Sequence, residues 1–107
     1  ATRSSIRDGL GSSGVENFKL EQNYPNPFNG STLIPFRADR PGRVHIGLYN
    51  IRGEKVTTII DRPVSAGRHQ VTFPGDGHTL QQISSGVYFY VLEAGTQKMI
   101  RKLIYVK

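Results

Sequence analysis

The chain has 107 residues and no cysteine, and 14 basic against 8 acidic residues give a formal net charge of +6. This length fits one domain with a modest core, and the lack of cysteine excludes disulfides and thiolate metal sites. No apolar run approaches the roughly 18 residues of a membrane-spanning helix, so the sequence predicts no membrane span.

Residues 1–16 are rich in serine, glycine and charged side chains, with Ile6, Leu10 and Val15 as aliphatic anchors. This composition is typical of a flexible linker or tag, so we place the folded domain at residues 17–107. The N-terminus lacks the basic and apolar segments of a signal peptide. Because Ala1 is not an initiator residue, we expect a module of a longer protein, with any export signal upstream.

The folded part begins with two short strands that flank a proline-containing segment. Phe18–Leu20 alternates apolar and charged side chains, as a short edge strand does. Residues 23–29 contain two prolines, which remove two backbone donors, so this segment should be extended or turned and lie outside any ladder. The Asn29-Gly30 turn signal leads into a strand over Thr32–Phe36, and Pro35 indicates that this strand lies at an edge or contains a bulge.

The clearest period-two run of the chain follows a turn at residues 40–42. Its apolar positions are Val44, Ile46 and Leu48. Side chains at alternate positions of a strand point to the same face of the sheet. We therefore expect all three to be buried between two sheets.

Two further strands and a loop are expected next. A tight reversal at residues 50–53 leads into the first strand, over 54–60, with Val56, Thr58 and Ile60 on one face. One face of the second strand, which opens at Ala66-Gly67, carries His69, Val71 and Phe73. Residues 74–82 concentrate turn-forming residues and predict the longest loop.

The strongest signal is a terminal hairpin. β-Branched and aromatic residues crowd the runs 85–92 and 99–106, and Glu93–Thr96 is a glycine-containing turn of hairpin length. Both faces of the run 85–92 are apolar, so we expect that strand to lie centrally in a sheet. No stretch has a helical period. About seven short strands predict an all-β fold, an antiparallel immunoglobulin-like β-sandwich with a flexible N-terminal tail.

Five ordered motifs between Phe18 and Lys107 give the sequence a family resemblance. They are Tyr24-Pro25-Asn26-Pro27-Phe28-Asn29, Asn50-Ile51-Arg52-Gly53-Glu54-Lys55-Val56, Ala66-Gly67-Arg68-His69, Ser85-Gly86-Val87-Tyr88-Phe89-Tyr90 and Arg101-Lys102-Leu103-Ile104. The set resembles the C-terminal sorting domain of type IX secretion substrates. Two positions depart from the family pattern, since Gly30 stands where proline is common and Phe73 where tryptophan is common.

The resemblance implies an immunoglobulin-like, non-catalytic module that directs a larger protein through the periplasm and an outer-membrane translocon to the cell surface or exterior. It also implies a sortase-like protease, which removes the module and can anchor the cargo to a surface glycolipid. The residues that the motifs assign to sorting are Tyr24, Pro25, Asn26, Pro27, Phe28, Asn29, Gly53, Gly67, Ser85, Gly86 and Tyr88. The candidates for translocon recognition are the basic residues Lys98, Arg101, Lys102 and Lys107. Cleavage is expected in the run 3–14 or just before Phe18.

Some of these residues also have a purely structural interpretation. Gly53, Gly67, Gly75 and Gly86 are expected at turns and strand starts that need a positive φ or a close approach of backbone. The proline segment lacks the PxxP spacing of a proline-rich recognition motif, so a rigid crossover between sheets is favoured.

Other chemistries have weaker signals. His45, His69 and His78 lack the spacing of a metal site, so no metal is expected. No serine lies in a G-x-S-x-G turn and the carboxylates are scattered, so neither catalysis nor a cofactor is predicted. The basic excess suits nucleic acid, an acidic glycolipid or simple solubility. Because Arg101 and Lys102 point to opposite faces of their strand, a nucleic-acid groove is disfavoured.

Two alternatives to a targeting module stay open. One is a carbohydrate-binding or cell-attachment β-sandwich of a secreted hydrolase, which requires Tyr49, Tyr88 or Tyr105 to line a groove or platform. The other is an immunoglobulin-like structural spacer, which also resembles the domain of flagellar hook-capping proteins. Coplanar exposed aromatic rings would favour the first of these.

Overall fold

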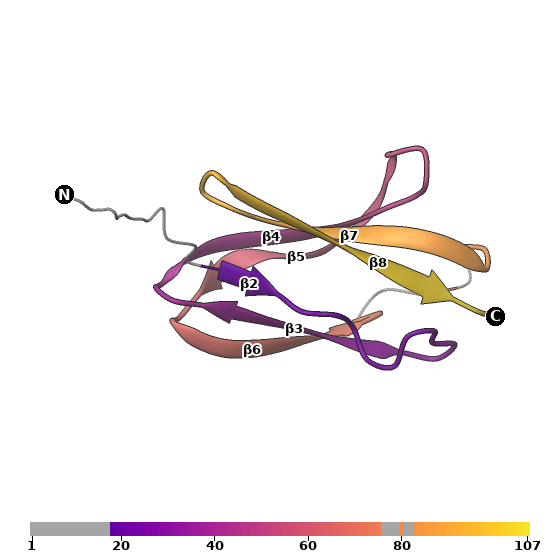
Figure 1. The fold of residues 1–107 in the computed structure, drawn as a ribbon, viewed down its shortest axis with the longest axis horizontal. Coiled ribbons are helices and arrows are strands. Elements are labelled where there is room, and N and C mark those ends of the chain that lie inside the picture. The colour runs from indigo at the N-terminus through magenta and orange to yellow at the C-terminus, as the bar shows by residue number, and fades with distance from the viewer. Residues whose placement is uncertain (1–17, 76–79, 81–82) are drawn as a thin grey trace.

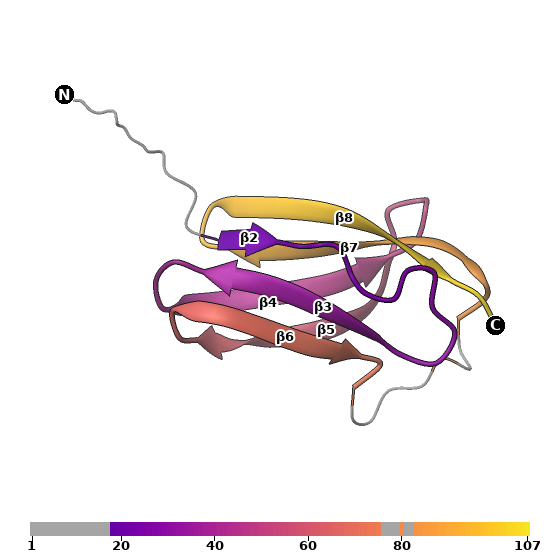
Figure 2. The ribbon, with the colours of Figure 1, turned by 60° about the horizontal axis from the view of Figure 1, so that its bottom comes forward.

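The computed structural model describes residues 18–75, 80 and 83–107, which form seven strands and no α-helix. The strands pack as two antiparallel sheets, ordered β2-β3-β6 and β5-β4-β7-β8 (Figures 1 and 2). Their bounds are Phe18–Leu20 (β2), Thr32–Ala38 (β3), Gly42–Tyr49 (β4), Lys55–Val64 (β5), Gly67–Phe73 (β6), Gly86–Ala94 (β7) and Gln97–Tyr105 (β8). The predicted all-β, immunoglobulin-like sandwich is confirmed.

The terminal hairpin is confirmed and is tighter than the sequence predicted. β7 and β8 pair without interruption from Gly86↔Tyr105 to Ala94↔Gln97, so the turn has only two residues, Gly95 and Thr96. Gly95 has a φ of 58°, which glycine adopts without strain and which matches the twist of a two-residue hairpin. β7 lies between β4 and β8, which is the central position expected from its two apolar faces.

The core lies between the two sheets. Val44, Ile46 and Leu48 are fully buried, as their spacing predicted. In the three-stranded sheet, Val71 and Phe73 are buried at the expected alternate positions of β6. Phe28 and Phe73 meet edge to face, with ring centroids 6.3 Å apart. The phenylalanine at position 73 therefore fills core space as a large aromatic side chain should.

The expectation that Pro35 places its strand at an edge or a bulge is wrong. β3 lies between β2 and β6 and pairs with β6 in regular register over Thr32–Ala38. β2 already ends at Leu20, opposite Phe36, and the Glu21 N–H donates to the Pro35 carbonyl. Pro35 therefore faces the side on which the β2 ladder has ended, where its missing N–H interrupts no ladder bond.

The expected common face of Val56, Thr58 and Ile60 is also wrong. The β4–β5 register shifts between Ile46/Gly47 and again between Leu48/Tyr49, so β5 carries extra residues relative to β4. Each extra residue reverses the side to which later side chains point. One extra residue lies between Ile60 and Thr58, so Ile60 lies opposite the buried Ile46, whereas Thr58 lies opposite Gly47 and beside the His45 ring on the outer face.

Two expectations fall on residues that the structure does not describe. The linker assigned to residues 1–16, with its cleavage position, lies outside the described residues, and so does most of the loop predicted at 74–82, including His78. The boundary at residue 17 therefore stays a prediction. No helix in the described part of the chain is long and apolar enough to cross a membrane.

Candidate functional site

Four segments meet at the end of the sandwich where β8 ends, which we call the C-terminal end (Figures 1 and 2). They are residues 22–31, the β4–β5 turn at 50–54, residues 83–86 before β7, and residues 106–107. The start of β2 and the tight β7–β8 turn lie at the opposite end. Three of the five sequence motifs are thereby brought to one end of the molecule.

A buried polar cluster fixes the conformation of the proline segment. Asn23 is only 2% exposed, and its Nδ2 donates to Thr32 Oγ1 at 3.0 Å and to the Pro25 carbonyl at 3.2 Å. Thr32 Oγ1 donates to the same carbonyl at 2.8 Å. A buried amide with bonded partners costs little, whereas an unbonded one costs about 1–3 kcal/mol. The cluster therefore specifies one shape for this segment.

The proline segment also covers the outer edge of β8. Asn26 Oδ1 accepts a hydrogen bond from Ile104 N at 2.9 Å. Phe28 N donates to the Ile104 carbonyl at 3.1 Å, and Val106 N donates to the Phe28 carbonyl at 2.9 Å. An exposed strand edge invites pairing with other chains. Between them these bonds protect the last part of β8.

The sorting-motif residues of this segment divide into buried and exposed sets. Phe28 is 3% exposed, and its ring lies 5.3 Å from that of Tyr105 between the sheets. The exposed set is Tyr24, Pro25, Asn26, Pro27 and Asn29. Tyr24 is 75% exposed although its backbone bridges to Leu33. Phe28 therefore anchors the segment, and the exposed set is presented to solvent.

Asn50 organises the β4–β5 turn. Its Oδ1 accepts hydrogen bonds from Arg52 N at 2.9 Å and Glu54 N at 3.0 Å, and its Nδ2 donates to Glu54 Oε1 at 2.8 Å. Gly53 completes the turn with a φ of 82°, a conformation that L side chains rarely adopt. Asparagine side chains commonly close turns in this way.

A second set of bonds holds the start of β7. The Tyr88 hydroxyl donates to the Ser84 carbonyl at 2.7 Å, while the ring is 7% exposed. This is the arrangement of the tyrosine corner in immunoglobulin-like domains, whose hydroxyl binds backbone a few residues upstream. Ser85 Oγ accepts a hydrogen bond from Lys107 N at 2.7 Å. The start of β7 is thus tied to the end of β8.

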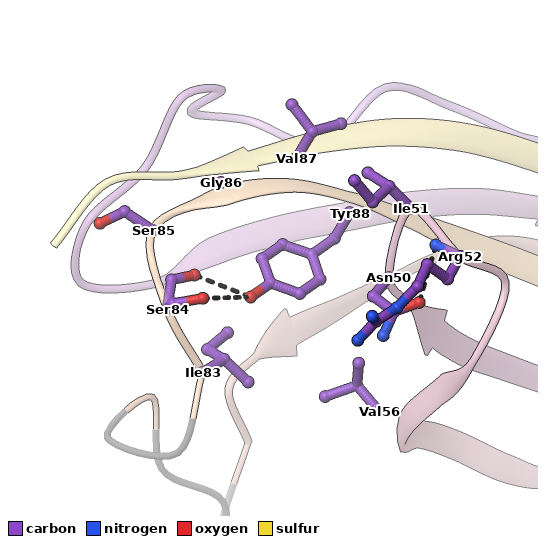
Figure 3. A pocket seen from close by; sticks show the side chains of 10 residues that line it. All are labelled: Asn50, Ile51, Arg52, Val56, Ile83, Ser84, Ser85, Gly86, Val87 and Tyr88. Carbon is purple, nitrogen blue, oxygen red and sulfur yellow. Dashed lines mark hydrogen bonds between the residues drawn. The ribbon is translucent and has the colours of Figure 1, made fainter.

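A pocket of about 580 Å³ opens between the β4–β5 turn and the start of β7. Figure 3 shows Ile51 and Arg52 on one side, Ile83 and Ser84 on the other, and the Tyr88 ring between them. Its lining consists of Asn50, Ile51, Arg52, Val56, Ile83, Ser84, Ser85, Gly86, Val87 and Tyr88. Two motifs that are about 35 residues apart in sequence therefore form one surface.

Exposed large apolar side chains gather at the same end. In the described residues these are Tyr24, Leu33, Ile51, Val56, Val87, Ile100 and Val106. All except Ile100 lie on or beside the four segments of the C-terminal end. They do not all face the same way, because Leu33 points out from the three-stranded sheet and Val87 out from the four-stranded sheet.

The predicted glycines differ in position and conformation. Gly67, with a φ of 125°, begins β6 at the opposite end, and Gly86 has a φ of 155° at the start of β7. Gly75 has no positive φ, and an added Cβ would meet the Thr72 carbonyl at 3.4 Å, an ordinary contact, so the expectation for this residue is wrong.

The four basic candidates are not brought together. Lys98 lies opposite Glu93 in the β7–β8 ladder, beside the turn, whereas Lys107 follows β8 at the C-terminal end. About 30 Å of extended chain therefore separates Lys98 from Lys107. Arg101 and Lys102 are both exposed and lie on opposite faces. Arg101 also has a structural contact, because its Nε donates to the Leu20 carbonyl of the other sheet at 3.0 Å.

Tyr90 makes a second hydrogen bond, after that of Arg101, from the four-stranded sheet to the segment at the end of β2. Its side chain is fully buried, and its hydroxyl donates to the Glu21 carbonyl at 2.6 Å. Burial raises the pKa of Tyr90 to about 12, although a backbone hydrogen bond from Asn23 and the charge of Arg101 act in the opposite direction. The hydroxyl therefore stays protonated and keeps donating over the physiological pH range.

The two described histidines are engaged in separate places. His45 Nε2 accepts a hydrogen bond from Lys55 Nζ at 3.0 Å, and its Nδ1 lies 3.5 Å from Glu93 Oε1 without a hydrogen bond. His69 stacks on Phe36 and donates from Nε2 to the Ser65 carbonyl. No group of three metal-ligating side chains occurs in the described residues.

The aromatic residues named for a carbohydrate platform do not form one. Tyr88 and Tyr105 are 7% and 4% exposed and belong to the core cluster between the sheets. Tyr49 follows the buried Leu48 on β4 and points to the outer face. The three rings therefore share no exposed surface, and the structure gives the carbohydrate-binding alternative no support.

A family model described as "Secretion system C-terminal sorting domain" matches residues 22–107. The chain belongs to this family of type IX secretion sorting domains. The match covers nearly all of the described sorting domain and includes all five motifs. No curated protein matches the chain. Membership makes the sorting domain a signal for type IX export to the cell surface or exterior and implies interaction with that machinery.

Sequence reasoning missed three residues that shape this end of the sorting domain. Asn23 was included only in the proline-containing segment, and Asn50 and Tyr90 stood within motifs without being assigned a role. An asparagine that opens a proline segment or a tight turn is a usable signal for a side-chain cap. The Tyr90 contact has no such signal, because its partner Glu21 is 69 residues away.

Proposed function

We propose that this sorting domain is a non-catalytic targeting signal on a longer secreted protein, and that the secretion translocon binds the C-terminal end of its sandwich. The observation that carries the proposal is the meeting of three sorting motifs at one end, where the exposed large apolar side chains also gather. A partner can then contact the segments at 22–31, 50–54 and 83–86 with one surface.

The arrangement of carboxylates supports a non-catalytic role. Each of the five carboxylates in the described residues lies 3.0–3.6 Å from a basic or histidine side chain; these are Glu21, Asp39, Glu54, Asp61 and Glu93. They are spread over both sheets, and their side chains are 42–64% exposed. A paired acid and base need two carboxyl groups at one cleft.

In this proposal the cargo and the translocon-binding surface lie at opposite ends of the domain. The polypeptide enters the domain at Phe18, at the end of the sandwich away from residues 106–107 (Figure 2). A translocon could therefore hold the C-terminal end while the cargo side stays accessible. A sortase-like protease would then cut in residues 3–14 or just before Phe18, and could transfer the cargo to a surface glycolipid.

The test is to fuse the whole chain to a periplasmic reporter in a host that has a type IX system. The reporter should reach the cell surface or medium, and it should stay in the periplasm when the host lacks the translocon. Release without the translocon, or retention of a folded fusion in its presence, would refute the proposal. N-terminal sequencing of the released domain locates the cut, and a cut inside residues 18–107 would refute the linker assignment.

A further inference from the structure

The pocket between the β4–β5 turn and the start of β7 has the features of a site for a short polypeptide segment. Its volume of about 580 Å³ falls in the range of binding pockets, which is about 300–1,000 Å³. Ile51 and Val56 stand exposed around it, at 74% and 37%. A partner that covers these apolar side chains would remove their surface from water, which favours binding.

The polar groups around this pocket are mostly engaged already. The Tyr88 hydroxyl donates to the Ser84 carbonyl, and Ser85 Oγ accepts from Lys107 N. The Asn50 side chain is used within its own turn. A sugar needs several free hydrogen-bonding groups, whereas an apolar side chain needs none.

The charge of the pocket defines the second requirement for its occupant. Among its described lining residues, Arg52 is the only charged one. Arg52 Nε lies 3.4 Å from Glu54 Oε1, in an exposed pair, and Asn50 also binds that oxygen. The guanidinium has further N–H groups in a planar fork that suits a carboxylate. The pocket is therefore complementary to an apolar side chain beside an acidic one.

We infer that this pocket binds a segment of a protein of the secretion machinery that presents an apolar side chain next to an aspartate or glutamate. The apolar side chain lies against Ile51, Val56 and the Tyr88 ring, and the carboxylate pairs with Arg52. This inference rests on the proposed function, because it names the place at which the secretion machinery binds the sorting domain and the chemistry of that contact.

The first test uses short amidated peptides and the whole chain. Peptides with a central leucine–aspartate pair should bind more tightly than those with leucine–asparagine or serine–aspartate, measured by fluorescence anisotropy. Ile51→Ser and Arg52→Glu should each weaken binding about tenfold or more. Arg52→Glu should also come to prefer leucine–lysine over leucine–aspartate, because its pocket charge is reversed.

Matched controls carry the same chemical changes outside the pocket. Ile100 is 58% exposed on β8, and Arg40 is exposed in the β3–β4 turn at the opposite end. Ile100→Ser and Arg40→Glu should leave peptide binding unchanged, and thermal melts should show that all four variants are folded. Equal binding of all peptides, no binding of any, or equal losses in the controls would overturn the inference, and so would self-association that buries Ile51.

An export assay separates failure of this inference from failure of the proposed function. The Ile51→Ser and Arg52→Glu fusions should remain in the periplasm while the wild-type and control fusions are exported. If the pocket variants are exported with the same efficiency as wild type, the pocket is not the site that the secretion machinery binds, although the sorting function stands. If the folded wild-type fusion is not exported either, the proposed function itself fails.

Discussion

The buried hydroxyl of Tyr90 should make the stability of the domain fall steeply at alkaline pH. Its pKa is raised from 10.0 to about 12 by burial, so the folded state holds the proton more tightly than the unfolded chain. The stabilisation of the folded state that this pKa shift provides is complete below pH 10 and is lost as the pH rises through about 12. At pH 11, one unit above the ordinary pKa of 10.0, Tyr90 is ionised in the unfolded chain but still protonated in the folded domain. At 1.36 kcal/mol for each pKa unit, this difference should lower the free energy of unfolding by about 1.4 kcal/mol.

Tyr90→Phe provides the comparison that isolates this effect. At pH 7 the variant loses the hydrogen bond to the Glu21 carbonyl, which should cost about 1–2 kcal/mol. By pH 11 the difference should shrink or vanish, because phenylalanine has no proton to lose. Urea melts at several pH values measure both free energies, and Tyr24→Phe, on a 75% exposed ring, controls for removing a phenol. A difference between wild type and Tyr90→Phe that stays constant from pH 7 to 11 would refute the reasoning.

Three further outcomes are expected. Ile46→Ala should lower the free energy of unfolding by about 2–5 kcal/mol, because this side chain is fully buried, and a negligible loss in a denaturant melt would count against a packed core. Asn50→Ala should cost about 0.5–1.5 kcal/mol by thermal melt, since two solvent-exposed backbone N–H groups lose their acceptor; an unchanged melting temperature would contradict a role of Asn50 in closing the turn. Arg101→Glu should destabilise by about 1 kcal/mol or more through loss of the Leu20 contact, whereas Lys102→Glu should stay within about 0.5 kcal/mol; equal losses would contradict the inter-sheet role of Arg101.

The sequence was sufficient for those parts of the fold that depend on local pattern. The alternation at Val44, Ile46 and Leu48 predicted their burial because strand side chains repeat every two residues. The two apolar faces of β7 predicted its central place for the same reason. Such signals are carried entirely by neighbours along the chain, so no knowledge of the other sheet was needed.

The errors arose where the partner strand decides the outcome. Pro35 is tolerated in the central strand of its sheet because β2 has ended at Leu20, and nothing near Pro35 in the sequence records where β2 ends. The face of Thr58 depends on the register shift between Ile46 and Gly47 of β4. Both are properties of a strand pair, and one strand's sequence does not reveal them.

The candidate site was predicted as a set of motifs but not as a place. The segments at 22–31, 50–54 and 83–86 were recognised separately, and only the fold brings them together at one end. The basic residues of β8 gave the opposite result, because neighbours in sequence were spread along an extended strand. Sequence proximity is thus a poor guide to a shared surface in a sandwich, where a strand as long as β8 carries its residues from one end to the other.

Because β8 supports the proline segment, truncating its end is a poor test of recognition. The backbone of Ile104 and Val106 bonds Asn26 and Phe28, so removing these residues would free the segment at 22–31 and expose the β8 edge. Lost export would then report unfolding as readily as lost contact. Exposed positions such as Ile51 separate the two, since its side chain is 74% exposed. A recognition surface in this fold is therefore best mapped by single exposed substitutions with a melt for each variant.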